Sequence, residues 1–192
     1  MRGSVYRLHD GEQVTVRRSS AEALEVDAVW RSTPAKPPVH LHPHQDERFE
    51  VSEGELSVEI EGRLHVVRAG EALEVPRGAV HRMWNGGEAP CRAVWRITPA
   101  LRTEEFFAAV EESRAHARAA RGGTITLLGS GPVLREFADE FRLPLPAPLA
   151  RPLLAVLAGL ARLRGYPSPG AGRVASGASP APRPAPRPRP HP

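Results

Sequence analysis

Residues 38–49 read Pro-Val-His-Leu-His-Pro-His-Gln-Asp-Glu-Arg-Phe, and this histidine-rich stretch decides how the rest of the chain is interpreted. His40 and His42 lie two residues apart. On an extended strand, successive side chains point to opposite faces, so both imidazoles are expected on the same face. The stretch therefore predicts two histidines directed at one point.

Two further ionisable residues lead alternating apolar runs. After the bend at Pro43, Glu47 begins a run with Phe49, which puts a carboxylate on an apolar face. His81 begins a second run with Met83 on its side. Phe49 lies two residues from Glu47, and Met83 lies two residues from His81, so each is expected on the same strand face as its ionisable neighbour. We therefore expect Phe49 and Met83 to line the same pocket as these groups.

A metal ion explains why three imidazoles and a carboxylate would be buried together. Buried apart, each group would need a partner or would change its protonation state. Three nitrogens and one oxygen suit Fe, Mn, Co, Ni, Cu or Zn better than Ca or Mg. In an octahedral shell they leave two positions open, as catalysis or ligand binding requires. The alternative is a hydrogen-bonded polar cluster without metal.

The surrounding sequence predicts strands. From residue 14 to residue 98 apolar residues mostly alternate with polar ones, and turn signals such as Asn85-Gly86-Gly87 recur at short spacing. About eight strands without a helix-length pattern between them favour an antiparallel sandwich or barrel.

Two spaced motifs carry a resemblance to the cupin superfamily. The first is His40-x-His42, four residues, Glu47, six residues, Gly54, and the second is Gly70, five residues, Pro76-x-Gly78, two residues, His81, three residues, Asn85. The resemblance covers roughly residues 20–98 and implies a double-stranded β-helix of the jelly-roll type.

The resemblance also implies roles for individual residues. It places the metal ligands at His40, His42, Glu47 and His81, with Glu47 as a candidate catalytic base. His44 is an additional histidine between the motif positions, and is a further candidate for the pocket lining. Single-domain cupins commonly pair, so a homodimer is expected.

The chain changes character after Pro99. Helices are predicted over 103–121, around 133–141 and around 153–164, where leucines form an apolar face. From residue 167 onward there are nine prolines among the last 26 residues, which predicts a disordered tail. We therefore expect a barrel domain over 1–100, a helical extension over 101–166 and a tail over 167–192.

Composition excludes several classes of function. The 192 residues, 41% of them hydrophobic and 25% charged, fit one globular domain with appendages. The net charge of +4 equals the four arginines of the 167–192 tail, so the rest is balanced, which argues against a nucleic-acid partner. The single Cys91 excludes an internal disulfide. Without a signal or membrane-spanning pattern, a cytoplasmic protein is expected.

Three functions remain open. The first is an iron- or manganese-dependent oxygenase of the quercetinase-like kind, acting on a small molecule. The second is a non-redox isomerase or epimerase of sugar-type substrates, in which the metal polarises a carbonyl. The third is a non-catalytic module that binds a small ligand. No feature of the sequence identifies the substrate.

Overall fold

The computed structural model of the chain describes residues 3–34, 36–119, 127–166 and 169. The strands run in chain order as β1 (Val5–His9), β2 (Glu12–Ser19), β3 (Leu24–Trp30), β4 (Asp46–Glu53), β5 (Glu55–Ile60), β6 (Arg63–Arg68), β7 (Ala72–Val75), β8 (His81–Asn85) and β9 (Cys91–Thr98). Three helices follow: α1 (Thr103–Ala119), α2 (Leu127–Glu136) and α3 (Ala147–Leu163).

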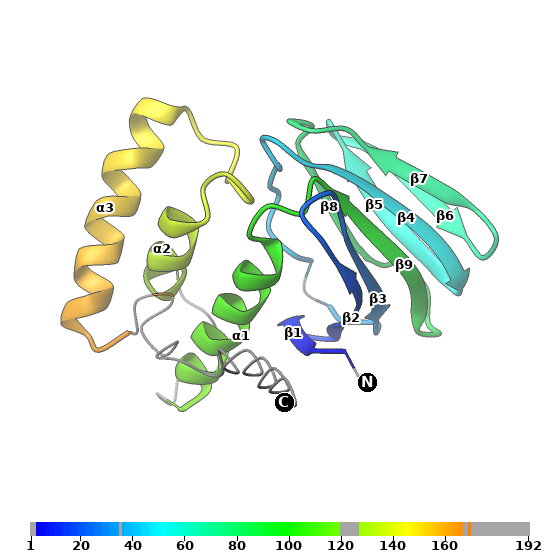
Figure 1. Cartoon of the computed structure of the whole chain (residues 1–192), viewed down its shortest axis with the longest axis horizontal. Coiled ribbons are helices and arrows are strands. Elements are labelled where there is room, and N and C mark those ends of the chain that lie inside the picture. The colour runs from blue at the N-terminus through cyan, green and yellow to red at the C-terminus, as the bar shows by residue number, and fades with distance from the viewer. Residues whose placement is uncertain (1–2, 35, 120–126, 167–168, 170–192) are drawn as a thin grey trace, which may run out of the picture.

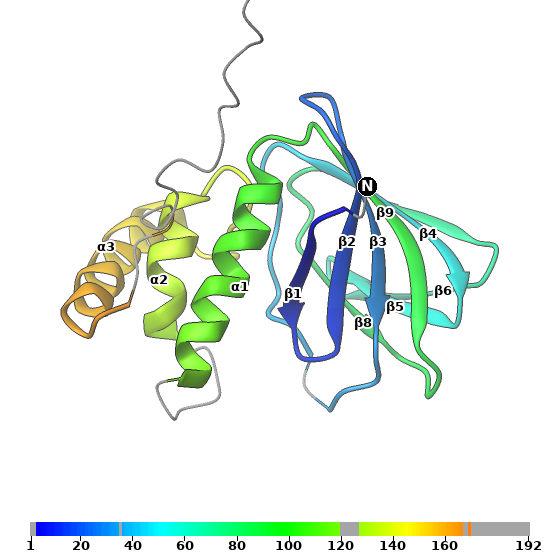
Figure 2. The same cartoon turned by 60° about the horizontal axis from the view of Figure 1, so that its bottom comes forward.

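The strands form two antiparallel sheets. The larger has the order β1-β2-β3-β9-β4-β7, and the smaller has the order β6-β5-β8. The two sheets face each other in Figures 1 and 2 and enclose the core between them. This arrangement confirms the predicted double-stranded β-helix.

Alternation along each strand produces that core. In β3 the side chains of Leu24, Val26, Ala28 and Trp30 are buried while those between them are more exposed. The inward rows of β9 and β4 continue this layer through the register pairs Val26–Trp95 and Trp95–Phe49. A one-residue slip in register would turn these rows outward, so the apolar pattern fixes the pairing.

The helices lie together on one side of the barrel. Figures 1 and 2 show α1 beside β1, α2 beyond α1, and α3 outermost. Three helices are present, but α2 spans Leu127–Glu136 instead of about Val133–Phe141, and α3 begins at Ala147 instead of Leu153. In both cases the structure extends the helix through a proline, Pro132 and Pro152 respectively, where the sequence predicts a boundary.

Two expectations depend on other parts of the chain. Among the described residues, no helix is long and apolar enough to cross a membrane. The predicted disordered tail over 167–192 lies outside the described residues, apart from Pro169.

Candidate metal centre

His40 and His42 lie on an extended segment between β3 and β4. The segment pairs with the start of β8, where the His40 amide donates to the His81 carbonyl at 2.9 Å and the His81 amide donates back at 2.8 Å. The Gly78 amide donates to the His42 carbonyl at 2.8 Å. These backbone bonds bring residues from both sequence motifs to one place.

The three imidazoles converge on one point. His40, His42 and His81 each offer one ring nitrogen, and these nitrogens lie within 4.8 Å of one another. All three residues are buried. Two of the ring pairs have centroids 5.1 and 4.4 Å apart, His40 with His42 and His40 with His81.

Backbone carbonyls fix the tautomer of each ring. Nδ1 of His40 lies 3.0 Å from the Pro38 carbonyl, and Nδ1 of His81 lies 2.9 Å from the Ala79 carbonyl. Nδ1 of His42 bonds to the Glu140 carbonyl. A carbonyl only accepts, so each Nδ1 carries the proton, and Nε2 of each neutral ring presents a lone pair to the centre.

Glu47 completes the cluster from the inward face of β4. Its Oε1 lies 3.2 Å from Nε2 of His42, and its Oε2 lies 2.9 Å from Nε2 of His81. Oε2 and both Nε2 atoms are buried and lack a hydrogen bond of normal geometry. Lone pairs therefore face one another at short range, and a cation between them, either a proton or a metal, is required.

These residues fit a divalent transition metal. Two ligand atoms at a right angle, each about 2.1 Å from one ion, are about 3 Å apart. The separations of Glu47 from His42 and His81 are of that size. Three imidazole nitrogens and one carboxylate suit a transition metal better than Ca²⁺ or Mg²⁺.

The electrostatics also favour a bound cation. Burial, together with the neighbouring His81 and His42, lowers the pKa of His40 to about 3, so its ring stays neutral. Burial alone would raise the pKa of Glu47, but the adjacent His42 and His81 rings hold it below its usual range. Burial acts to lower the pKa of His42, but Glu47 raises it above its usual value, so in the metal-free site His42 holds the proton that neutralises Glu47. A bound metal ion would replace that proton.

Trp95 supports the carboxylate from β9. Its indole Nε1–H donates to Oε1 of Glu47 at 3.1 Å. An alternating strand pattern shows on which face Trp95 lies, but it does not show which group the indole N–H donates to. Glu47 pairs with Ile97 in the β4–β9 register, and Trp95 is the next inward residue along β9. The strand pairing therefore brings the Trp95 side chain next to Glu47.

The segment after α2 covers the outer side of the centre. The Phe141 ring stacks on the His40 ring, with centroids 4.4 Å apart and planes 16° apart. Arg142 pairs with Leu41 through two backbone hydrogen bonds of 2.9 Å. The helical extension therefore contributes to the site, although its residues carry no local sequence signal for this role.

The three predicted pocket residues lie in different surroundings. Phe49 is fully buried and stacks on Trp95, with centroids 5.5 Å apart. Met83 is buried two positions after His81 on the same face of β8. The His44 side chain is 59% exposed, and its Nε2 lies 3.8 Å from Asp139, so the ring is directed away from the other histidines.

Comparison with known proteins identifies a family for the barrel. The cupin domain family matches residues 29–97. The tetracenomycin polyketide synthase protein TcmJ of Streptomyces glaucescens is 40% identical over 60 residues, which are 31% of this chain and 40% of that protein. The polyketide synthase CurC of Streptomyces cyaneus is 35% identical over 60 residues, which are 31% of this chain and 39% of that protein.

The matches to both curated relatives thus span about 40% of those proteins' length. Among solved structures, KdgF from a Halomonas species aligns with 53% of this chain and 90% of its own, with a TM-score of 0.48 and 19% identity.

Proposed function

Since residues 29–97 are a cupin domain, we propose that the protein binds one divalent transition metal and uses it to transform a small organic molecule. The ligands are His40, His42, Glu47 and His81. The observation that carries the proposal is the convergence of three buried imidazole nitrogens within 4.8 Å of one another, two of them beside the Glu47 carboxylate, with every Nδ1 directed at a backbone carbonyl. Fe or Mn is the preferred ion, ahead of Ni, Co, Cu and Zn.

The reaction we favour is an oxygenation of the quercetinase-like kind. When bound, iron or manganese would supply Lewis acidity and redox chemistry toward dioxygen and an organic substrate. Glu47 is the catalytic residue, because its carboxylate can accept a proton from the substrate at one oxygen. The Trp95 N–H holds the other oxygen in place through its 3.1 Å hydrogen bond.

The chain's apolar residues exclude water from this chemistry. Phe49 and Trp95 stack on the β4–β9 side, and Phe141 covers His40 from the other. Met83 lies next to the ligands along β8 and would contact the substrate. Because the curated relatives are named as polyketide synthase proteins, we propose a polyketide-derived substrate.

We also propose that the protein is a cytoplasmic homodimer. The sheet edges at β1 and β7 offer one interface. A second lies on α3, where exposed apolar residues recur at intervals of four and three: Leu149, Leu153, Val156, Leu160 and Leu163. This period of 3.5 suits packing against a second copy of the same helix. Light scattering that gives a monomer mass at micromolar concentration would contradict the dimer.

Metal analysis by mass spectrometry tests the central proposal. Protein purified without chelators or an affinity metal is expected to hold close to one equivalent of Fe or Mn, and His42→Ala and Glu47→Ala are each expected to lose it. His44→Ala is the matched control, because its ring lies outside the cluster, and it should keep the metal. No metal in the native protein, even after reconstitution, would reject the metal site.

Oxygen uptake then tests the reaction. The reconstituted enzyme is expected to consume oxygen with one of a panel of flavonols, diketones and catechols. Turnover that persists with zinc would favour the non-redox isomerase instead. Tight binding of a ligand without turnover under several metals would favour a binding module.

A further inference from the structure

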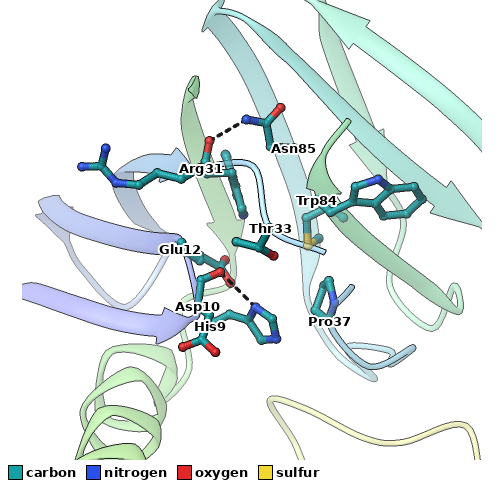
Figure 3. Close-up of a pocket in the computed structure, with 11 residues that line it drawn as sticks. His9, Asp10, Glu12, Arg31, Thr33, Pro37, Trp84 and Asn85 are labelled. Atoms are coloured by element: carbon teal, nitrogen blue, oxygen red, sulfur yellow. Dashed lines mark hydrogen bonds between the residues drawn. The ribbon is translucent and has the colours of Figure 1, made fainter. Parts of the chain in front are cut away.

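The barrel interior beside His81 is closely packed. Figure 3 shows a pocket between the β1–β2 turn, the segment after β3, and β8, and Met83 lines it two residues after His81. Its free space suffices for about one water molecule. Glu12 also lines it, shares the parity of buried Val14, and accepts a hydrogen bond from the indole of its register partner Trp30. On this side the barrel itself encloses the ligands, whereas the helical extension covers their other side.

The three ligand rings differ in where their Nδ1 acceptors come from. Nδ1 of His40 and Nδ1 of His81 each bond to the carbonyl two residues earlier in the chain. The carbonyl two residues before His42 belongs to His40, and it accepts from the His81 amide instead. Nδ1 of His42 bonds to the carbonyl of Glu140, 98 residues away. The orientation of the His42 ring, unlike that of the other two rings, therefore depends on the helical extension.

The side chain of Glu140 is anchored at the start of α1. The residue is 4% exposed, and its Oε1 accepts from the Arg102 amide at 3.1 Å. The Arg102 carbonyl accepts from the Phe106 amide at 2.9 Å, as in the first turn of a helix, so the carboxylate lies at the positive end of the α1 dipole. Glu140 thus joins two elements, because its carboxylate bonds to α1 and its carbonyl bonds to His42.

The residues after Glu140 are held by separate contacts. The Phe141 ring stacks on His40, and it also stacks on Phe106 of α1 with centroids 5.3 Å apart. Arg142 exchanges two backbone hydrogen bonds of 2.9 Å with Leu41. These contacts restrain the chain that follows Glu140, whereas the bond to α1 restrains Glu140 itself.

Gln45 connects the start of α1 to the barrel. Its side chain is 1% exposed, and its Nε2 lies 2.7–3.0 Å from two carbonyls and the Thr103 hydroxyl at the start of the helix. Gln45 also precedes the proposed ligand Glu47 by two residues. Hydrogen bonds therefore lead from Gln45 at the start of β4, through the start of α1 and Glu140, to a second proposed ligand, His42.

We propose that Glu140 is a positioning residue for the metal centre. Its carboxylate, held by the Arg102 amide, fixes the main-chain carbonyl that orients His42, and His42 in turn directs Nε2 at the metal. A hydrogen bond at Nδ1 also makes the other ring nitrogen a better donor, and losing such a partner lowers metal affinity about 10- to 100-fold. The inference rests on the proposed function for the presence of the metal, and Glu140 lies outside both motifs that carry the cupin resemblance.

Zinc binding by the full chain tests this role, with competition against a chromogenic chelator as the measurement. Glu140→Ala is expected to lower the Zn²⁺ affinity by about tenfold or more. Glu140→Gln keeps an oxygen that can accept from the Arg102 amide, so it should recover most of this loss. Glu136→Ala is the matched control, because Glu136 bonds to the guanidinium of the same arginine at 3.0 Å and takes no part in the link to His42. This control should bind Zn²⁺ as wild type does.

Nitrogen-15 NMR of the histidine rings gives a readout that a general loss of stability would not produce. In metal-free protein the Nδ1–H of His42 is expected to exchange slowly with water, because it donates to the Glu140 carbonyl. Glu140→Ala should shift this resonance and speed its exchange. The Nδ1–H resonances of His40 and His81 should stay unchanged in the same spectrum, because their acceptors are local.

The two measurements separate this proposal from the metal proposal. Wild-type protein that binds no Zn²⁺ would reject the metal, and the His42 resonance of metal-free protein would then decide the role of Glu140. An unchanged His42 resonance in Glu140→Ala would overturn that role. In protein that binds Zn²⁺, an affinity loss in Glu140→Gln or Glu136→Ala as large as that in Glu140→Ala would also overturn it. If Glu140→Ala does not fold, Glu140→Asp carries the same expectation, because it draws the carboxylate back by one methylene.

Discussion

The imidazole of His42 donates from Nδ1 to the main-chain carbonyl of Glu140, which lies 98 residues further along the chain. Hydrogen bonds of this kind orient a metal-binding histidine and fix its tautomer. The carbonyl belongs to the segment after α2, so the helical extension helps to build the site in the barrel. The predicted division between 1–100 and 101–166 thus passes between a proposed ligand and the group that orients it.

The Phe141 ring gives a direct test of that contribution. Phe141→Ala removes the ring that stacks on His40 at 4.4 Å and opens the centre to water, so the metal affinity is expected to fall by about tenfold. Phe141→Leu keeps most of the bulk and should recover only part of this loss. Competition with a chromogenic chelator measures the affinity, and Phe141→Ala protein that binds metal as wild type does would contradict the contribution.

Sequence pattern predicts the cluster of proposed ligands because its members lie on extended segments, where side chains alternate with a period of two. Parity places His40, His42, Glu47 and His81 on inward faces, and the spacing that resembles a cupin implies that the four residues form one site. Glu12 shares its parity with Val14 in the same way, so the signal for a second inward carboxylate was present in the sequence. The apolar alternation begins only at Val14, so it does not by itself extend the strand back to Glu12.

The contacts of the extension could not be predicted in this way. The carbonyl of Glu140 and the ring of Phe141 reach the site through the packing of the extension against the barrel, and no local pattern encodes their position. The start of α2 was missed because Gly129, Gly131 and Pro132 all disfavour a helix. Tertiary packing overrides that propensity, since α2 lies directly against α3.

A substitution of Trp95 tests how much its hydrogen bond stabilises the buried Glu47 carboxylate. Trp95→Phe keeps an aromatic ring in the core but removes the donor to Oε1 of Glu47, which leaves a buried acceptor without its partner. We expect the metal-free protein to lose about 1–3 kcal/mol in its free energy of unfolding. Urea denaturation followed by circular dichroism measures the change, and Trp84→Phe serves as the control because Trp84 does not contact Glu47. Equal losses in the two variants would show that ring size matters and the hydrogen bond does not.

Two glycines of the helical extension should respond in opposite directions to alanine. A Cβ at Gly131 in α2 would lie 2.8 Å from Cβ of Leu157 and 3.2 Å from the Ala158 amide nitrogen in α3. Gly131→Ala is therefore expected to force the helices apart and cost about 1–3 kcal/mol. Nothing lies within 4 Å of a Cβ at Gly159, so Gly159→Ala should stabilise α3 by about 0.5–1 kcal/mol. Thermal unfolding of both variants checks the pair, and a gain in stability for Gly131→Ala would contradict the close packing of α2 on α3.

The raised pKa of Glu12 predicts how stability depends on pH. Burial raises this pKa from its usual value of 4.5 to about 7. Between these values the folded protein holds a proton on Glu12 that the unfolded chain has lost, so the free energy of unfolding falls as the pH rises through this window. Its slope from this one group is at most about 1.4 kcal/mol per pH unit.

Glu12→Gln isolates that contribution, since glutamine does not titrate and nearly matches the shape of the protonated acid. The free energy of unfolding, measured with urea in chelator at pH 5, 6, 7 and 8, should fall less with pH in Glu12→Gln than in wild type. The difference between the two proteins should then level off above pH 7, where Glu12 is charged in both the folded and the unfolded state. A difference that stays constant from pH 5 to pH 8 would mean that the Glu12 carboxyl is solvated in the folded protein.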